Sequence, residues 1–171
     1  NIKTALVTGA ASGLGYELAL LLAKDAYRLI LVDVDTENLT KVKAEIEHGF
    51  NVEVIALVKD LSLPNIAQTI IDDIDNAPVD VLINNAGFGL FGSFGETDWE
   101  RESAMLHVHI ITTTHLTKLV LEGMIKRGSG QILNMSSLAA FQPGPLMSIY
   151  YASKSYMLSF SEAIANELKG T

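Results

Sequence analysis

A tyrosine and a lysine stand at a spacing that suits proton transfer. Tyr150 and Lys154 are four residues apart, so on a helix they lie on the same face. A phenol titrates near pH ~10, too high for a base at neutral pH, and a nearby ammonium favours the phenolate. Such a tyrosine can exchange a proton with a carbonyl or alcohol oxygen while hydride moves at the carbon. The same spacing also arises by chance on helix surfaces, where the lysine is simply solvated.

Two serines precede this pair at the end of a predicted strand. Ser136 and Ser137 follow the apolar run at 131–135. A serine hydroxyl at the end of a strand could hold the oxygen with which the tyrosine exchanges its proton. The serine and the Tyr–Lys pair together are therefore far more specific than either alone.

A glycine-rich turn at the other end of the chain predicts a dinucleotide site. It follows the first predicted strand and opens the first predicted helix. Glycines permit a tight turn and a close approach of the backbone to a pyrophosphate, and the helix N-terminus attracts that anion. A glycine turn alone is ordinary, but the strand before it and the helix after it are the context that the site needs. The candidate cofactor-binding residues in this turn are Gly9, Ser12, Gly13, Leu14 and Gly15.

Acidic residues end the second and third predicted strands. Asp33 stands where a carboxylate would accept hydrogen bonds from the adenosine ribose, and a 2′-phosphate would be repelled there. No Arg or Lys follows at Val34 or Asp35, so we expect NAD rather than NADP. Asp33 could also be a solvated strand-end acid. The pair Asp60-Leu61 could contact the adenine or simply begin a turn.

An asparagine-rich loop ends the fourth predicted strand. Its sequence is Asn84-Asn85-Ala86-Gly87. Small residues at this edge would let a cofactor pass, and amides would brace neighbouring backbone. We take Asn85, Ala86 and Gly87 as candidate cofactor-binding residues, although such a loop is also ordinary turn chemistry.

These motifs must be positioned by alternating strands and helices. Short apolar runs predict strands at 4–8, 29–33, 52–58, 79–84 and 131–135. Helical patterns occupy 13–24, 36–48, 64–76, 98–126 and 148–168. Strand–helix alternation with nearly continuous apolar strands predicts an α/β fold: one Rossmann-like, doubly wound parallel sheet forming a single dinucleotide-binding domain over residues 1–171.

Composition excludes several classes of function. The chain has 171 residues, a formal net charge of −8 and no cysteine. The acidic balance argues against a nucleic-acid partner and against an anionic membrane surface. Thiolate catalysis is excluded, and the four histidines show no metal-binding pattern with acidic residues. We see no signal peptide, and the stretch 18–32 is too short and charged to span a bilayer, so a cytoplasmic location is expected.

The order of these motifs resembles the short-chain dehydrogenase/reductase family over the whole chain. The resemblance rests on the glycine-rich turn, Asp60-Leu61, the 84–87 loop, the serine and the Tyr–Lys pair. It implies that Ser137 orients the substrate, that Tyr150 is the general acid/base, and that Lys154 assists it and binds the nicotinamide ribose. It also implies a homodimer or homotetramer formed through the helices at 98–126 and 148–168.

Two features depart from the family pattern. Family members usually carry an asparagine, part of a proton relay, where this chain has His109. A histidine could preserve the backbone kink, tune the relay by its own titration near pH ~6.5, abolish it, or simply be a satisfied buried side chain. The family scaffold also continues with another strand, helix and strand, so we expect the chain to be incomplete, with its fifth strand at a bare sheet edge.

Three functions compete on these grounds. The first is a nicotinamide-dependent oxidoreductase acting on a small carbonyl or secondary alcohol. The second is an NAD(H)-binding sensor or assembly subunit with little turnover, which the histidine and the missing segment motivate. A structural domain without cofactor would leave the glycine turn and Asp33 coincidental. The substrate itself is not predicted. Four residues after the 84–87 loop suggest an apolar wall or could pack under the loop: Phe88, Leu90, Phe91 and Phe94.

Overall fold

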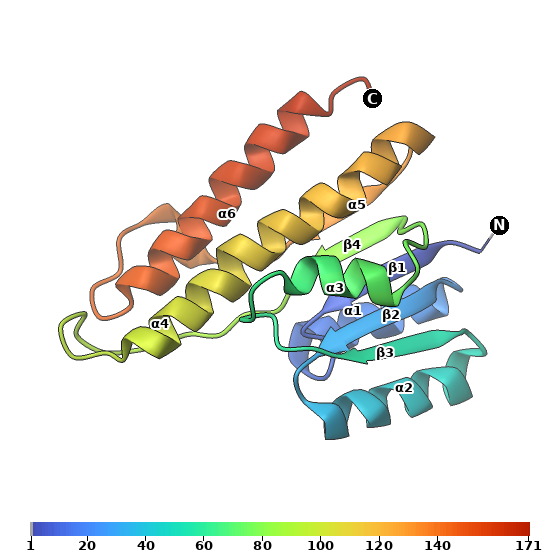
Figure 1. Ribbon diagram of the computed structural model, residues 1–171, viewed down its shortest axis with the longest axis horizontal. Coiled ribbons are helices and arrows are strands. Elements are labelled where there is room, and N and C mark those ends of the chain that lie inside the picture. The colour runs from blue at the N-terminus through green and yellow to red at the C-terminus, as the bar shows by residue number, and fades with distance from the viewer. Residues whose placement is uncertain (1) are drawn as a thin grey trace.

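The computed structural model describes residues 2–171, and within them a five-stranded parallel sheet is covered by helices on both faces (Figure 1). The strand order is β3-β2-β1-β4-β5, and every neighbouring pair is parallel. The predicted doubly wound sheet is therefore confirmed. The strands are β1 (Thr4–Thr8), β2 (Arg28–Asp33), β3 (Val54–Val58), β4 (Val81–Asn84) and β5 (Gln131–Asn134).

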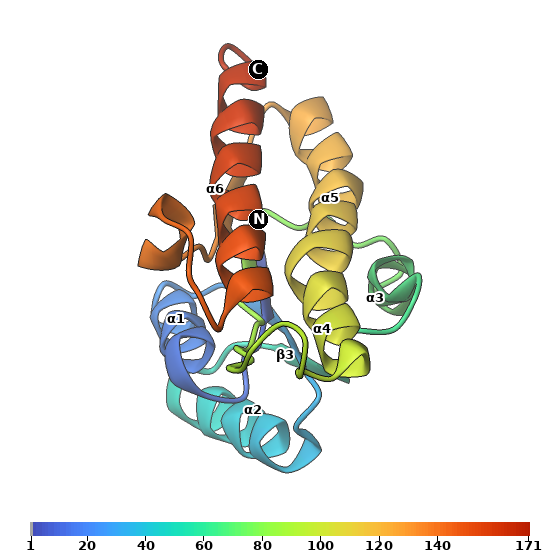
Figure 2. The ribbon, with the colours of Figure 1, turned by 90° about the vertical axis from the view of Figure 1, so that its left-hand side faces the viewer.

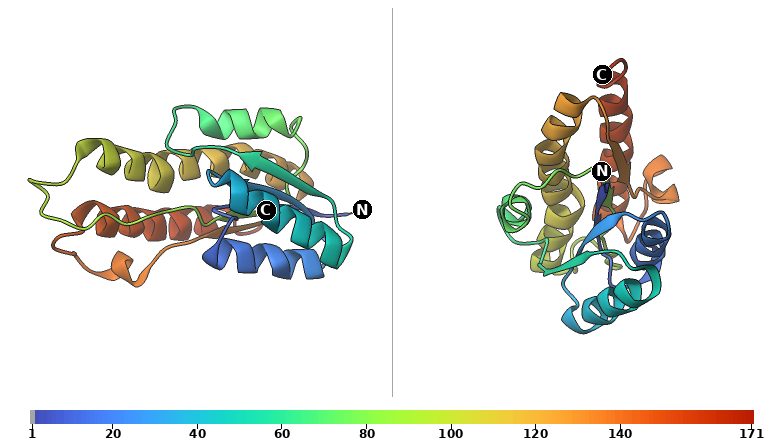
Figure 3. Two further views of the ribbon diagram at one scale, coloured as in Figure 1. Left: turned by 90° about the horizontal axis from the view of Figure 1, so that it is seen from below. Right: turned by 90° about the vertical axis from the view of Figure 1, so that its right-hand side faces the viewer.

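Helices form a layer on each side of the sheet. The helices α1 and α2 cover one face, and α3 and α5 cover the other (Figure 3, left). Side chains alternate along β1, so Ala5 and Val7 face the α1–α2 layer while Leu6 faces α3 and α5. Because both faces are buried, the strands need apolar residues at every position. The helices are α1 (Gly13–Lys24), α2 (Thr36–Phe50), α3 (Ile66–Asp73), α4 (Trp99–Leu106), α5 (Thr113–Arg127) and α6 (Ser148–Glu167).

The long helix predicted over 98–126 is interrupted. A π-helical segment, η1 (His107–Thr112), separates α4 from α5. The Thr113 hydroxyl donates to the Val108 carbonyl five residues earlier, at 2.9 Å. Apolar periodicity does not reveal one extra residue in a turn, and such turns are frequent at functional sites. A short 3₁₀ segment, η2 (Leu138–Phe141), was not predicted either.

The strand order reverses between β1 and β4, and this places the glycine-rich turn next to the 84–87 loop. The chain builds outward from β1 to β3, then crosses to β4 on the other side of β1. Loops at the carboxyl ends of the strands separate at such a point and leave a crevice. The combined helix α4–η1–α5 and α6 run side by side over the β4–β5 half of the molecule (Figures 1 and 2).

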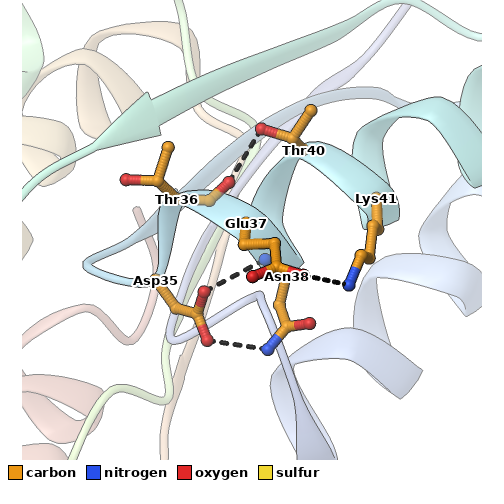
Figure 4. Close-up of polar contacts among 6 residues, drawn as sticks. All are labelled: Asp35, Thr36, Glu37, Asn38, Thr40 and Lys41. Atoms are coloured by element: carbon orange, nitrogen blue, oxygen red, sulfur yellow. Dashed lines mark hydrogen bonds and ion pairs between the residues drawn. The ribbon is translucent and has the colours of Figure 1, made fainter.

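Polar contacts fix the step from β2 into α2 (Figure 4). Asp35 caps α2: its carboxylate accepts from the Asn38 backbone N–H at 3.0 Å and from the Asn38 side-chain amide at 2.7 Å. These donors lower the pKa of Asp35. Lys41 pairs with Glu37 one turn along the helix, at 2.6 Å. The cap defines where α2 begins, two residues after Asp33 ends β2 at the carboxyl edge of the sheet.

Across residues 2–171, none of the helices combines the length and apolar character needed to cross a membrane.

Candidate active site

The glycine-rich turn between β1 and α1 has the tight backbone conformation that a dinucleotide-binding turn requires. Gly9 and Gly13 have φ values of +66° and +56°, a region that favours glycine. The Gly9 backbone N–H donates to the Val32 carbonyl at 2.8 Å, which ties the turn to β2. A Cβ atom on Gly15 would overlap the Gly9 carbonyl oxygen, so the start of α1 packs directly against the turn.

The 84–87 loop braces this turn from the neighbouring strand. The Asn85 amide donates to the carbonyl oxygens of Thr8 and Gly9, at 3.2 and 3.1 Å. The Thr8 hydroxyl accepts from the backbone N–H groups of Asn85 and Ala86, both at 3.1 Å. Asn84 instead points into the sheet, where its amide donates to Asn134 at 2.8 Å. The Asn85 amide therefore braces neighbouring backbone as the sequence suggested, whereas the Asn84 amide bonds side chains. Thr8 is a contributor that the sequence did not single out.

A cavity of about 510 Å³ lies along the carboxyl ends of β1 to β4. Most of the predicted cofactor-binding residues line it: Gly9, Ser12, Leu14, Asp33, Asp60, Leu61, Asn85, Ala86 and Gly87. The other four, Gly13, Gly15, Tyr150 and Lys154, are not among its lining residues. A groove of similar size between β5, α5 and α6 contains none of the predicted site residues. The first cavity is therefore the candidate cofactor site.

The two strand-end acids in this cavity differ in their contacts. The Asp33 carboxylate accepts from the Ala11 backbone N–H at 2.9 Å and from the Asp35 backbone N–H at 3.0 Å, so it also holds the glycine-rich turn. Asp60 accepts from the backbone N–H and the hydroxyl of Ser62, at 2.9 and 2.7 Å. Asp60 therefore begins the turn that follows β3, and it also lines the cavity.

Lys59 is a cavity residue that the sequence analysis missed. It precedes Asp60 and lines the same cavity. Its ammonium pairs with the Asp73 carboxylate of α3 at 2.5 Å. No sequence motif marked this lysine, because the pairing depends on how α3 packs beside β3.

Tyr150 and Lys154 share a face at the start of α6, as their spacing predicts. The Lys154 ammonium lies 5.7 Å from the centroid of the Tyr150 ring. It donates to the Met135 carbonyl, at the end of β5, at 2.9 Å. Lys154 is only 7% exposed, and burial lowers its pKa. The next residue, Tyr151, instead packs its ring against Gly144 in the loop before α6.

The predicted serines lie where β5 meets α6. The Ser136 hydroxyl donates to the Lys154 carbonyl at 3.1 Å. Ser137 caps η2, and its side-chain oxygen accepts from the Ala139 backbone N–H at 3.1 Å. The Ser137 hydroxyl hydrogen is not used in that bond, so it can be donated to another oxygen.

His109 lies in η1 and is 3% exposed. The Phe88 backbone N–H donates to its Nε2 at 3.1 Å, and its Nδ1 lies 2.8 Å from the Ser153 hydroxyl oxygen. Burial, and secondarily the charge of Lys154, lower its pKa to about 4. The ring is therefore neutral at neutral pH, and it is a buried side chain whose two nitrogens both have hydrogen-bond partners. Ser153 gave no signal in the sequence.

Three of the four apolar residues after the 84–87 loop, the phenylalanines, are exposed, and Leu90 is partly buried. Phe91 and Phe94 are 72% and 64% exposed, and Phe88 lines the candidate cofactor cavity. The segment after the loop is tied to the segment before α6, because the Gly92 N–H donates to the Leu146 carbonyl at 2.8 Å. The three phenylalanine rings are therefore not part of the core.

The fold and these motifs define a Rossmann-like α/β protein with a Tyr–Lys pair beside the cofactor crevice. The family model for short chain dehydrogenases matches residues 3–171, and the chain belongs to this family.

Relatives and solved structures agree with this assignment. The chain is 32% identical over 170 residues to very-long-chain 3-oxoacyl-CoA reductase of Mus musculus, covering 96% of this chain and 54% of that protein. It thus spans about half the length of this curated relative. A short-chain dehydrogenase from Sphingobium yanoikuyae in complex with NADPH superposes with a TM-score of 0.92 at 31% identity, over 98% of this chain and 66% of that one. An NAD⁺-bound xylitol dehydrogenase gives a TM-score of 0.87 at 29% identity, over 98% and 65%.

Proposed function

We propose that the full-length protein is an NAD(P)-dependent oxidoreductase that transfers hydride between a nicotinamide cofactor and a carbonyl or secondary alcohol. The observation that carries this proposal is the Tyr150–Lys154 pair, with the buried ammonium 5.7 Å from the ring centroid and anchored at the end of β5. Membership of the family supports it, as do relatives named as reductases and dehydrogenases.

The cavity fits a dinucleotide. Gly9 and Gly15 leave no room for a Cβ, which would overlap Asn85, Ala86 or the Gly9 carbonyl, so the tight turn at the start of α1 depends on glycine. The first turn of α1 contains no acidic residue that would oppose a pyrophosphate at its N-terminus. Ser12 and Leu14 would flank the pyrophosphate, Asp33 the ribose, and Asp60 with Leu61 the adenine. When bound, the nicotinamide supplies the carbon that gives or takes hydride.

The side chains of α6 and η2 would handle the proton. Tyr150 gives a proton to the substrate oxygen during reduction, or takes it during oxidation. Ser137 donates its free hydroxyl hydrogen to the same oxygen and so orients it. Lys154 has three N–H donors and uses one on Met135. The other two can bind the ribose of the nicotinamide.

The replacement Tyr150→Phe tests the proposal. It removes only the hydroxyl, so we expect kcat to fall by at least about 100-fold while NADH binding stays within a few-fold. Turnover would be followed by nicotinamide absorbance with a panel of ketones and aldehydes, and binding by NADH fluorescence.

Tyr151→Phe is the matched control, because it removes a hydroxyl from the neighbouring ring. Most of the activity should survive it. Retention of activity in Tyr150→Phe would overturn the assignment. Tight NADH binding with no turnover of any carbonyl by the wild-type protein would favour the sensor or assembly subunit instead.

We also propose that the protein prefers NAD and that it forms a homo-oligomer. The Asp33 carboxylate in the candidate cofactor cavity supports the first, although NADPH occurs among the similar structures. Exposed Trp99, Ile111 and Tyr156 on α4, η1 and α6 support the second. Light scattering on the full-length protein measures the oligomeric state, and a monomer would contradict the proposal.

A further inference from the structure

His109 joins three segments through one buried ring. It lies in η1, it accepts from the Phe88 backbone N–H in the loop beside the cofactor cavity, and it contacts Ser153 of α6. Its ring also meets the rings of Phe88 and Tyr150 edge to face, with centroids 6.0 and 5.8 Å apart. A Cβ on Gly87 would come within 2.7 Å of Nε2, so the loop approaches the ring closely enough to require glycine.

The direction of each hydrogen bond follows from the chemistry of the donors. A backbone N–H can only donate, so Nε2 must keep its lone pair toward Phe88. The proton of the neutral ring is then on Nδ1, which donates to the Ser153 oxygen at 2.8 Å. Ser153 in turn donates its own hydrogen to the Tyr150 carbonyl, also at 2.8 Å. The chain of bonds runs from the loop, through the ring, to the backbone of the tyrosine.

This arrangement sets the position of Tyr150 without offering its proton a path. The bonds end on the Tyr150 carbonyl, not on its hydroxyl, so they cannot deliver the phenolic proton. Ser153 lies between Tyr150 and Lys154 in α6, and its side chain is completely buried. A shift of the loop relative to α6 would break at least one of the bonds. Loss of this positioning should slow the reaction strongly, because small displacements of a reacting group such as Tyr150 lower the rate.

We propose that His109, with Ser153 as its obligatory partner, is a positioning residue that fixes the Tyr150–Lys154 face of α6 relative to the loop that borders the cofactor cavity. This inference rests on the proposed oxidoreductase function. It assigns His109 no proton-transfer step.

The first test needs no turnover. In full-length protein carrying ¹⁵N-labelled histidine, we expect NMR at pH 7 to show His109 with a protonated Nδ1 and an unprotonated Nε2. Ser153→Ala should shift the Nδ1 signal. A ring protonated on Nε2, or on both nitrogens, would overturn the proposal, whatever the activity of the protein.

The second test measures coupling between the two residues. His109→Phe keeps a ring but removes both hydrogen bonds, and Ser153→Ala removes the acceptor. Each should lower kcat about tenfold or more, the factor that corresponds to one buried hydrogen bond, with a much smaller change in NADH affinity. The double variant should lose little more than either single variant. Independent, multiplicative losses, or a Ser153→Ala enzyme with wild-type kcat, would contradict the partnership.

Controls separate positioning from general loss of structure. His109→Asn supplies an amide with one acceptor and a donor group, so it should retain more activity than His109→Phe. His107→Phe is the matched control: His107 lies in the same η1 segment, and its ring bonds only to the Ser103 carbonyl, at 2.9 Å. It should leave kcat near wild type, and melting temperatures would confirm that each variant folds. A wild-type protein without turnover would refute the proposed function, while the NMR experiment would still decide the role of His109.

Discussion

At the scale of single residues, Asp33 is the side chain on which cofactor choice depends. Both of its carboxylate oxygens accept backbone N–H bonds, one from Ala11 in the glycine-rich turn and one from Asp35. The charge is thus held in a fixed orientation at the cavity. A 2′-phosphate placed beside it would be repelled, while ribose hydroxyls could donate to it. Among the described residues that line this cavity, the one lysine is Lys59, and its ammonium pairs with the Asp73 carboxylate.

We therefore expect NADH to bind the full-length protein at least about tenfold more tightly than NADPH, a difference of about 1.4 kcal/mol. Asp33→Asn removes the negative charge but keeps an oxygen that can accept from the Ala11 backbone N–H. It should therefore weaken the repulsion of the 2′-phosphate and narrow the difference in affinity between NADH and NADPH. Titration calorimetry with both cofactors measures the ratio. Asp60→Asn, a carboxylate replaced in the same cavity, is the control and should change the ratio little. Tighter binding of NADPH by the wild-type protein would refute the preference.

The residues of the site were predictable to different degrees. Tyr150 and Lys154 were found because helical spacing alone puts them on one face, and the structure places them there. Ser153 was not found, because its importance arises from contact with a side chain 44 positions away in the chain. His109 was noticed only as a departure from the family pattern. The ring is neutral because it is buried, and both of its nitrogens make hydrogen bonds. The sequence does not report that burial.

At the scale of elements, all five strands were predicted in the right order, but the starts of two of them were placed too early. The predicted third and fourth strands began at Val52 and Val79, whereas the sheet ladder begins at Val54 and Val81. Val79 is nonetheless buried, at 4% exposed. Apolar sequence reports burial, and burial extends beyond the residues that pair with a neighbouring strand. The π-helical segment η1 was not predicted for a related reason, because it changes the backbone hydrogen bonds without changing the pattern of apolar residues.

The glycine-rich turn gives a prediction at this scale. A methyl group at Gly15 would overlap the Gly9 carbonyl and crowd the Asn85 amide, so Gly15→Ala must push α1 away from the turn. We expect it to destabilise the fold by about 1–3 kcal/mol, the usual cost of overpacking, and to weaken NADH binding at least about tenfold.

Gly49→Ala is the matched control for the turn. Gly49 lies inside α2, and a Cβ there meets nothing within 4 Å. Alanine should therefore stabilise the helix by about 0.5–1 kcal/mol and leave NADH affinity unchanged. Urea unfolding and cofactor titration of both variants provide the comparison. Equal behaviour of Gly15→Ala and Gly49→Ala would show that the close packing at the turn is not required.

At the scale of the whole molecule, the buried His109 contacts both parts of the candidate site. These are the cofactor cavity at β1–β4 and the Tyr150–Lys154 pair beside β5, on α6. Its contacts come from the 84–87 side of the sheet and from α6, which are far apart in the chain and adjacent only in the fold. The free energy of unfolding of the whole protein should therefore depend on whether the His109 ring is protonated. The charged group that faces the ring is the Lys154 ammonium, whose repulsion adds to the effect of burial.

The sign of the pH dependence follows from the lowered pKa of His109. The ring titrates at about 4 in the folded protein and near 6.5 when unfolded. Below pH 6.5 the unfolded chain takes up a proton that the folded protein does not, so the free energy of unfolding falls with pH until about pH 4. The full loss would be about 3 kcal/mol. His109→Gln cannot titrate, so urea unfolding of both proteins between pH 7 and 4 should show the variant losing less stability. Carboxylates common to both proteins cancel in that difference. Parallel pH profiles would mean that His109 is protonated in the folded state as readily as in the unfolded one, contrary to the neutral ring inferred here.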